Sequence, residues 1–178
     1  IRKKYKIAVI HDAAHALGTM SGNTMVGSTA DLTCFSFYST KNLTTGEGGM
    51  ITTNSKKHME HLRIIALHGM SKGAWNRYTG AGSWKYQILA LGYKYNLPDM
   101  ASSLGLIQLR NFDKMQAARR RAAALYNKYL GDVDELVLPH EPVDGKHAWH
   151  LYIIKLRNGG EKLRDRVIED LNAAGVGT

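Results

Sequence analysis

Three side chains whose chemistry suits a bound cofactor stand at the ends of two expected strands. Asp12 follows an apolar run over residues 7–10. Ser36 and Lys41 stand at the end of a second run, residues 32–37. Ligands of open α/β sheets bind beyond the carboxyl ends of the strands, so these side chains are expected to meet at one edge. A carboxylate that keeps a pyridine nitrogen protonated and an amine that forms a Schiff base suit pyridoxal phosphate. A lysine after a strand is usually just exposed, so spacing alone leaves that alternative open.

The elements expected to position these side chains alternate between strands and helices, as in an α/β fold. A short helical turn is expected after Asp12, and a glycine-rich turn after Lys41. The expected elements are strands over 7–10, 32–37 and 50–53, a helix from 55 to about 67, a long helix from about 98 that breaks near 111–113, a basic helix over about 114–130, a strand over 151–156 and an amphipathic helix ended by Gly175. A shift in composition near residues 131–145 predicts a domain junction.

The composition is that of a soluble globular protein. Of the 178 residues, 44% are hydrophobic and 22% are charged, and no apolar run approaches the length of a membrane span. The single cysteine, Cys34, can form no intrachain disulfide and is interpreted as a buried small residue. No signal peptide heads the sequence. These features favour a cytoplasmic protein with no membrane partner, and no metal site is expected.

The net charge of +9 raises the alternative of nucleic-acid binding. Much of the excess is scattered as single charges, and the densest clusters are residues 2–4 and residues 119–121. Neither cluster is interleaved with aromatic residues in a known nucleic-acid motif. Solvated faces are therefore favoured over a nucleic-acid site, and a basic surface also suits an anionic substrate.

Several strings of the sequence, taken in order, carry more specific information. They are residues 10–16 (IHDAAHA), 35–49 (FSFYSTKNLTTGEGG), 67–69 (LHG), 92–99 (GYKYNLPD) and 147–152 (HAWHLY). Together they resemble the DegT/DnrJ/EryC1/StrS family of sugar aminotransferases, from end to end of the chain. The resemblance implies an α/β fold, that of pyridoxal-phosphate-dependent transferases of fold type I. Residues 1–130 are then the second half of the large domain and residues 131–178 the start of the small C-terminal domain, which makes the chain an internal fragment.

The resemblance implies a role for four residues around the cofactor. Lys41 forms the internal aldimine and moves a proton between the sugar carbon and the cofactor, while Asp12 pairs with the pyridine nitrogen. Ser36 binds the cofactor phosphate, and His15 lies near the cofactor ring. His15 as a core histidine and Ser36 as a backbone partner remain alternatives.

Further residues are implied to complete the site. Asn96 reaches the phosphate of the cofactor held by the neighbouring subunit, which implies a homodimer with shared active sites. Asn96 as a helix-start residue remains an alternative. His68, Trp149 and His150 are weaker candidates for lining the substrate site, and His68 is equally typical of a helix C-terminus.

The implied substrates are a nucleotide-linked keto sugar and glutamate as the amino donor. Residues 72–78, 94–96 and 147–150 look most like those of family members acting at C4 of a UDP-linked sugar, as in lipid A modification. Such enzymes serve lipopolysaccharide or other cell-surface polysaccharide biosynthesis. Enzymes making 3-amino sugars on dTDP carriers, or 4-amino hexoses, remain alternatives. So do a non-catalytic or regulatory DNA-binding relative and a fragment that is inert by itself.

Overall fold

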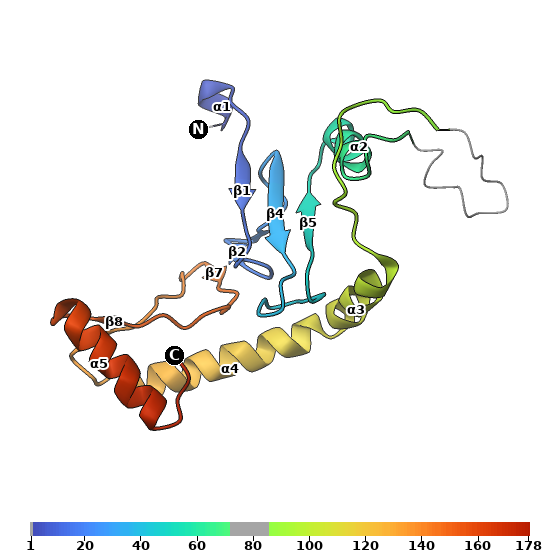
Figure 1. Cartoon of the computed structure of the whole chain (residues 1–178). Helices are drawn as coiled ribbons and strands as arrows, with labels where there is room; N and C mark the ends of the chain where they lie inside the picture. The colour runs from blue at the N-terminus through green and yellow to red at the C-terminus, as the bar shows by residue number, and fades with distance from the viewer. Residues whose placement is uncertain (1, 72–85) are drawn as a thin grey trace.

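The computed structural model describes residues 2–71 and 86–178, which form strands and helices in mixed order (Figure 1). The strands are β1 (Ile10–Asp12), β2 (Met20–Ser21), β3 (Thr24–Met25), β4 (Leu32–Ser36), β5 (Gly49–Thr52), β6 (Leu136–Val137), β7 (Gly145–Lys146) and β8 (Lys155–Leu156). The helices are α1 (Arg2–Tyr5), α2 (Lys56–Ile65), α3 (Asp99–Arg110), α4 (Phe112–Leu130) and α5 (Gly160–Ala173). The α/β class expected from the sequence is confirmed.

A three-stranded sheet in the order β1-β4-β5 lies in the middle of the molecule (Figure 1). β1 pairs with β4 in parallel and β4 pairs with β5 antiparallel. Both parallel strands therefore end at the same edge, on the side of the sheet where α4 lies (Figure 1). Burial alternates along β4, with Thr33 and Phe35 buried on one face and Cys34 half-buried on the other. The sheet thus has a packed face and an open face.

The first strand differs from its prediction. The sequence predicted a buried strand over residues 7–10, whereas β1 begins at Ile10, and Ile7 and Ile10 are 51% and 63% exposed. Pairing with the β4 side begins at Val9, whose carbonyl accepts from the backbone N–H groups of Asp31 and Leu32. Only then does the regular ladder start. β1 is also an edge strand within the described residues, so its apolar side chains gain little cover.

A second small sheet was not predicted. β2 and β3 form a hairpin around Gly22 and Asn23, and β7 pairs antiparallel with β2 through Met20 and Lys146. A two-residue loop with glycine at a positive φ, here +55° at Gly22, is typical of tight hairpins. This sheet ties the segment after α4 back to the first part of the chain.

The helices follow the sequence closely. Ser55 caps α2 by accepting from the backbone N–H of His58, and Pro98 precedes α3 as expected. The break expected near residues 111–113 lies at Asn111, between α3 and α4. None of the helices in the described part of the chain is long and apolar enough to cross a membrane.

The strand predicted over residues 151–156 is shorter than expected. Only Lys155 and Leu156 form a strand, and they pair with Val137 and Leu136 of β6. The preceding residues 148–150 are instead held against α4 by hydrogen bonds described below. The predicted domain junction over residues 131–145 stays a prediction; this stretch carries β6 and leads into β7.

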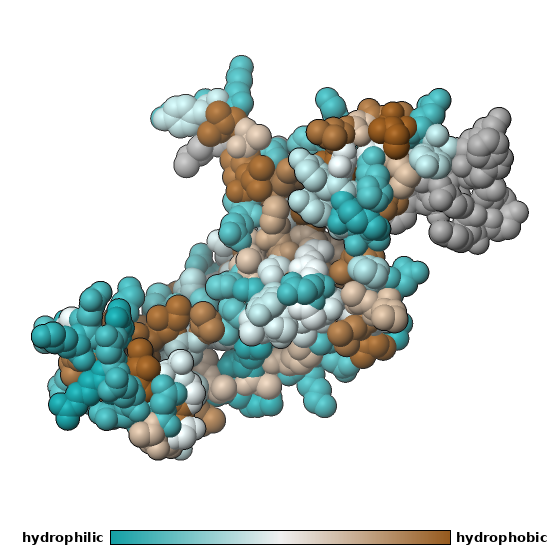
Figure 2. Space-filling view, viewed as in Figure 1, coloured by the Kyte–Doolittle hydropathy of each residue, from teal (hydrophilic) through white to brown (hydrophobic). Residues whose placement is uncertain are grey.

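The buried core is small. It consists of Ala13, Phe35, Phe37 and Leu43, with partly buried Ala16, Leu17, Val26 and Phe112 packed against it. Apolar side chains of β1 and α3 lie at the surface, where Leu106 and Leu109 of α3 are each 57% exposed (Figure 2). The core therefore lies between the packed face of β4, the turn after β1 and the start of α4.

Candidate active site

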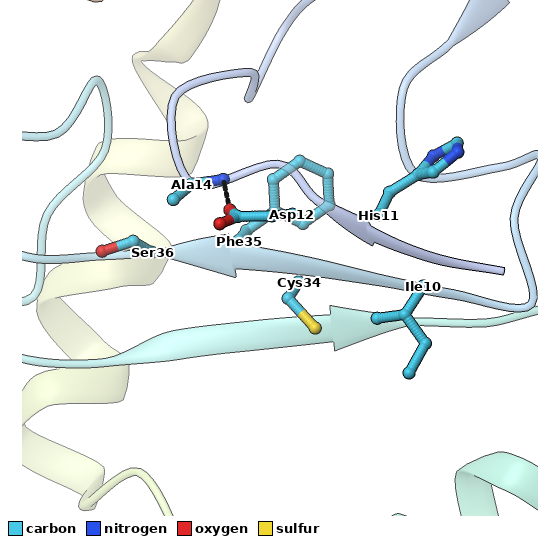
Figure 3. Close-up of a pocket in the computed structure, with 7 residues that line it drawn as sticks. All are labelled: Ile10, His11, Asp12, Ala14, Cys34, Phe35 and Ser36. Atoms are coloured by element: carbon cyan, nitrogen blue, oxygen red, sulfur yellow. Dashed lines mark hydrogen bonds between the residues drawn. The ribbon is translucent and has the colours of Figure 1, made fainter.

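The carboxyl ends of β1 and β4 bring Asp12 and Ser36 to one edge of the sheet, as predicted (Figure 3). The parallel register pairs Asp12 with Cys34, two residues before Ser36. Asp12 Oδ1 accepts from the backbone N–H of Ala14 at 3.0 Å, and Ser36 Oγ accepts from that of Tyr38 at 3.3 Å. Both hydrogen bonds span two residues, so neither side chain is committed to distant structure.

An open hollow lies beside these two side chains (Figure 3). Its volume is about 420 Å³, within the range of roughly 300–1,000 Å³ that is typical of small-molecule sites. It is lined by Ile10, His11, Asp12, Ala14, Cys34, Phe35 and Ser36. A carboxylate, a hydroxyl and apolar walls fit an aromatic cofactor with a basic ring nitrogen and a phosphate. Cys34, interpreted from the sequence as a buried small residue, is half-buried on this open face.

Lys41 lies in the loop that follows β4. The backbone N–H of Lys41 donates to the Tyr38 carbonyl at 3.0 Å, which closes a turn. The backbone N–H of Phe37 donates to the Gly48 carbonyl at 2.8 Å and so closes the loop. Gly48 has φ +152°, and an added Cβ would lie 2.4 Å from Thr45 Oγ1. Lys41 is half-buried, and its neighbour Asn42 is 4% exposed.

Two histidines from distant segments meet next to this loop. The rings of His15 and His150 have centroids 4.3 Å apart and planes tilted by 49°. His150 Nδ1 lies 3.2 Å from Asn42 Oδ1. Burial lowers the pKa of His150, and the charges of His15, Lys41 and Arg119 lower it further. These surroundings favour the neutral form of His150, which belongs to the same cluster as Lys41.

A buried set of amides, which sequence reasoning missed, connects the Lys41 loop to α4. Asn42 Nδ2 donates to Gln116 Oε1 at 3.0 Å and to the Ala148 carbonyl at 2.6 Å. Gln116 Nε2 donates to the same carbonyl at 3.2 Å. We call Asn42, Gln116, Ala148 and His150 the amide junction. Asn42 lies inside one of the motifs that match the family, but sequence reasoning assigned it no role. Gln116 stands out in the sequence only as an uncharged residue in a basic helix.

Trp149 has its ring packed within the chain. It is 5% exposed, and its ring lies 4.5 Å from that of His147 and 5.8 Å from that of Tyr152. Its carbonyl accepts from Arg119 at 3.2 Å. Its φ of +47° is uncommon for a bulky residue and costs about 1–3 kcal/mol. Trp149 therefore anchors residues 148–150 on α4.

No hydrogen bond or ring contact of the described residues joins His68 or Asn96 to Lys41. His68 follows α2, which lies beyond the opposite edge of the sheet from the carboxyl ends of β1 and β4 (Figure 1). Its backbone N–H donates to the Tyr93 carbonyl. The Asn96 side chain accepts a hydrogen bond from Lys94. The sugar-selecting loop expected over residues 72–78 lies outside the described residues.

The fold of the chain matches solved structures of sugar aminotransferases. The chain belongs to the DegT/DnrJ/EryC1/StrS aminotransferase family, whose sequence profile matches residues 1–178. Pyridoxal phosphate is the cofactor of this family. The resemblance inferred from the motifs is thereby confirmed.

Three relatives illustrate the match. The spore coat polysaccharide biosynthesis protein SpsC of Bacillus subtilis is 45% identical over 156 residues, covering 88% of this chain and 40% of its own. The sugar aminotransferase Spr1654 of Streptococcus pneumoniae, solved in PLP, PMP and apo forms, superposes in its PMP form with a TM-score of 0.87 at 31% identity, covering 99% of this chain and 46% of its own. PseC of Helicobacter pylori, an aminotransferase of pseudoaminic acid biosynthesis, gives a TM-score of 0.87 at 28% identity, covering 98% and 45%. The chain thus spans less than half the length of these relatives.

Proposed function

We propose that the protein containing this chain transfers an amino group from glutamate to a keto sugar on a nucleotide carrier, in the first place a UDP-linked 4-keto sugar. The observation that carries the proposal is the meeting of Asp12 and Ser36 at one sheet edge, with Lys41 in the loop that follows Ser36. Membership of an aminotransferase family supports it. So do relatives named for polysaccharide and pseudoaminic acid biosynthesis.

Each of these side chains has a defined task in such a reaction. Bound pyridoxal phosphate supplies an electron sink that stabilises negative charge on the carbon next to the transferred nitrogen. The Asp12 carboxylate holds a proton on the pyridine nitrogen, and the Ser36 hydroxyl donates to the phosphate. Lys41 Nζ holds the cofactor covalently and moves the proton at the reacting carbon.

The proposal includes a homodimer in which Asn96 serves the neighbouring subunit. Within its own chain Asn96 accepts from Lys94, on the segment that leads into α3, and no described contact joins it to Lys41. We place its amide at the cofactor phosphate of a second copy, with His15 beside the ring in its own copy. His68 joins the substrate wall from that second copy, where its exposed side chain is available.

The nucleotide carrier is supported by charge. The sequence carries a net charge of +9, which attracts a dianionic diphosphate over a neutral sugar. Arg119 contributes to structure instead, because it donates to the carbonyls of Trp149 and His150. A cytoplasmic location is part of the proposal, since nucleotide sugars are made there.

The first test is covalent attachment. The full-length protein is loaded with pyridoxal phosphate, reduced with borohydride and digested, and the peptide masses are measured. We expect the cofactor adduct on the peptide containing Lys41, and its loss together with the visible absorbance in Lys41→Ala. Lys162→Ala, an exposed lysine of α5, is the matched control and should keep both. A protein that stays colourless and unmodified would sink the proposal.

The second test is the substrate. Purified full-length protein is given UDP-4-ketopentose and glutamate, and the amino sugar is sought by mass spectrometry. Product from dTDP-3-keto sugars alone would move the specificity to that branch. Duplex DNA bound at physiological ionic strength, without cofactor attachment, would instead favour a regulatory relative.

A further inference from the structure

The side-chain amide of Asn42 has an orientation that its partners determine. The Ala148 carbonyl can only accept, so the atom of Asn42 that lies 2.6 Å from it must be the NH2 group. The second hydrogen of that group goes to Gln116 Oε1 at 3.0 Å. Both donors of Asn42 are therefore used, and the atom facing His150 is the carbonyl oxygen Oδ1.

This orientation determines the tautomer of His150. Asn42 Oδ1 can only accept, and it lies 3.2 Å from His150 Nδ1, so Nδ1 carries the hydrogen. In a neutral imidazole the other nitrogen then has a free lone pair. We propose that Asn42 is a positioning residue that holds His150 as its Nδ1–H tautomer, so that His150 Nε2 accepts a hydrogen bond from a sugar hydroxyl at the Lys41 site. This rests on the proposed function and names the part of the substrate that His150 recognises.

The chemistry of the lone pair selects between the two proposed substrates. A neutral acceptor favours a hydroxyl donor and disfavours a carboxylate, which also brings lone pairs. Glutamate is recognised mainly through its carboxylates, whereas a keto sugar offers hydroxyl groups. His150 is thus expected to act in the sugar half of the reaction and to contribute little in the glutamate half.

The surroundings favour the neutral form of His150 and hold its backbone in place. The charged and titratable groups facing it are His15 from the turn after β1, Lys41 from the loop after β4 and Arg119 from α4, and with burial they lower its pKa. Arg119 holds the carbonyls of Trp149 and His150 at 3.2 and 3.5 Å. The neighbouring residue, Trp149, has a φ of +47°. Such a backbone conformation persists only where the surrounding contacts hold it in place.

The tautomer can be measured directly, without cofactor or turnover. The full-length protein is labelled with 15N-histidine, and the ring nitrogens of His150 are assigned with His150→Asn. At neutral pH we expect a protonated Nδ1 and an unprotonated Nε2. In Asn42→Ala the Nε2–H form should gain population. A wild-type ring with Nε2 protonated overturns the proposal, whether or not the protein binds pyridoxal phosphate.

Two substitutions of His150 separate the hydrogen bond that its Nδ1–H donates to Asn42 from the lone pair on its Nε2. Asn places its NH2 group where Nδ1 was and keeps the bond to Asn42, but removes Nε2. Gln places its amide near the position of Nε2 and loses the hydrogen bond to Asn42. We expect His150→Asn to raise the KM for UDP-4-ketopentose by about tenfold, the size of one hydrogen bond, with the KM for glutamate unchanged. His150→Gln should recover part of the sugar KM.

The KM measurements include a control variant and two results that would overturn the proposal. His140→Asn, an exposed histidine elsewhere, should change neither constant. If Lys41 carries the cofactor and both His150 variants keep the wild-type KM for the sugar, the proposal is wrong while the aminotransferase function stands. Equal increases in both KM values would indicate a general structural role and would also overturn it.

Discussion

The open sheet edge and the amide junction use polar side chains in opposite ways. Asp12 and Ser36 make hydrogen bonds that span two residues, and they border a hollow. Asn42 and Gln116 are each 4% exposed, and Asn42 forms bonds that span 74, 106 and 108 residues. Buried polar groups must be satisfied within the fold, whereas groups that bind a ligand must keep free capacity. Local bonds and exposure thus mark the side chains proposed to bind the cofactor, and long-range bonds and burial mark those that connect distant segments of the fold.

The largest expected effect comes from breaking the junction. Gln116→Leu removes the acceptor of Asn42 Nδ2 and one donor to the Ala148 carbonyl. Two buried groups each lose a partner, which costs about 2–4 kcal/mol of unfolding free energy. Urea denaturation of the cofactor-free protein measures this. Asn127→Ala, which loses an exposed bond to Tyr152, should cost under about 1 kcal/mol. Equal losses would erase the contrast between buried and exposed amides.

At the sheet edge a substitution is expected to weaken cofactor binding and to leave the free energy of unfolding almost unchanged. Asp12→Asn removes a charge-assisted partner of the pyridine nitrogen, worth about 1.5–3 kcal/mol, so affinity for pyridoxal phosphate should fall roughly 10- to 100-fold. Stability without cofactor should hardly change, because Asp12 is exposed and bonded only locally. Fluorescence titration and urea denaturation separate the two quantities. Asp134→Asn is the control. Unchanged affinity in Asp12→Asn would remove the distinction drawn for this edge.

A glycine pair tests how closely the turn carrying His15 rests on α4. Gly18 has φ +88°, and an added Cβ would lie 2.9 Å from Phe112 Cε1 and 3.0 Å from Gln116 Nε2. Gly22 also has a positive φ, +55°, but nothing within 4 Å. Gly22→Ala should cost about 1 kcal/mol from its backbone alone, and Gly18→Ala about 1–2 kcal/mol more, from crowding. Thermal unfolding of both variants measures the difference, and similar melting temperatures would mean that the turn can move away from α4.

The smallest expected effect is a dependence on pH. The pKa of His150 is lowered in the folded protein, so between that value and the ordinary value near 6.5 the unfolded chain binds more protons. Stability is therefore complete above about pH 6.5 and declines as the pH falls through this window. His150→Asn should flatten the decline, whereas His140→Asn should leave it. Urea midpoints at a series of pH values provide the measurement. An equally steep decline of the midpoint in His150→Asn and in the wild type would contradict the assignment of this pH dependence to His150.

Sequence reasoning recovered the sheet edge better than the junction, for a physical reason. Asp12, Ser36 and Lys41 follow apolar runs, and strand ends are local features that a sequence displays. Asn42 and Gln116 meet only because the chain folds back over 74 residues, and neither has a local signal for that pairing. The hairpin at Gly22 did have a signal, a two-residue loop with glycine, that was not used. The early start predicted for β1 failed because apolar residues extend beyond the point where backbone pairing begins.

Helix α4 gives these findings a consequence for how the chain tolerates insertions. Phe112 and Gln116 pack under the turn of His15, Gln116 bonds Asn42, and Arg119 holds residues 148–150. These three positions lie on one face, since residues three or four apart share a side of a helix. One inserted residue between Phe112 and Arg119 would rotate the two ends of this face by about 100° relative to each other. Length changes beyond Leu130 would leave the face intact. The relative positions of His15, Asn42 and residues 148–150 therefore depend on the helical register of α4 more than on the length of the loops that follow it.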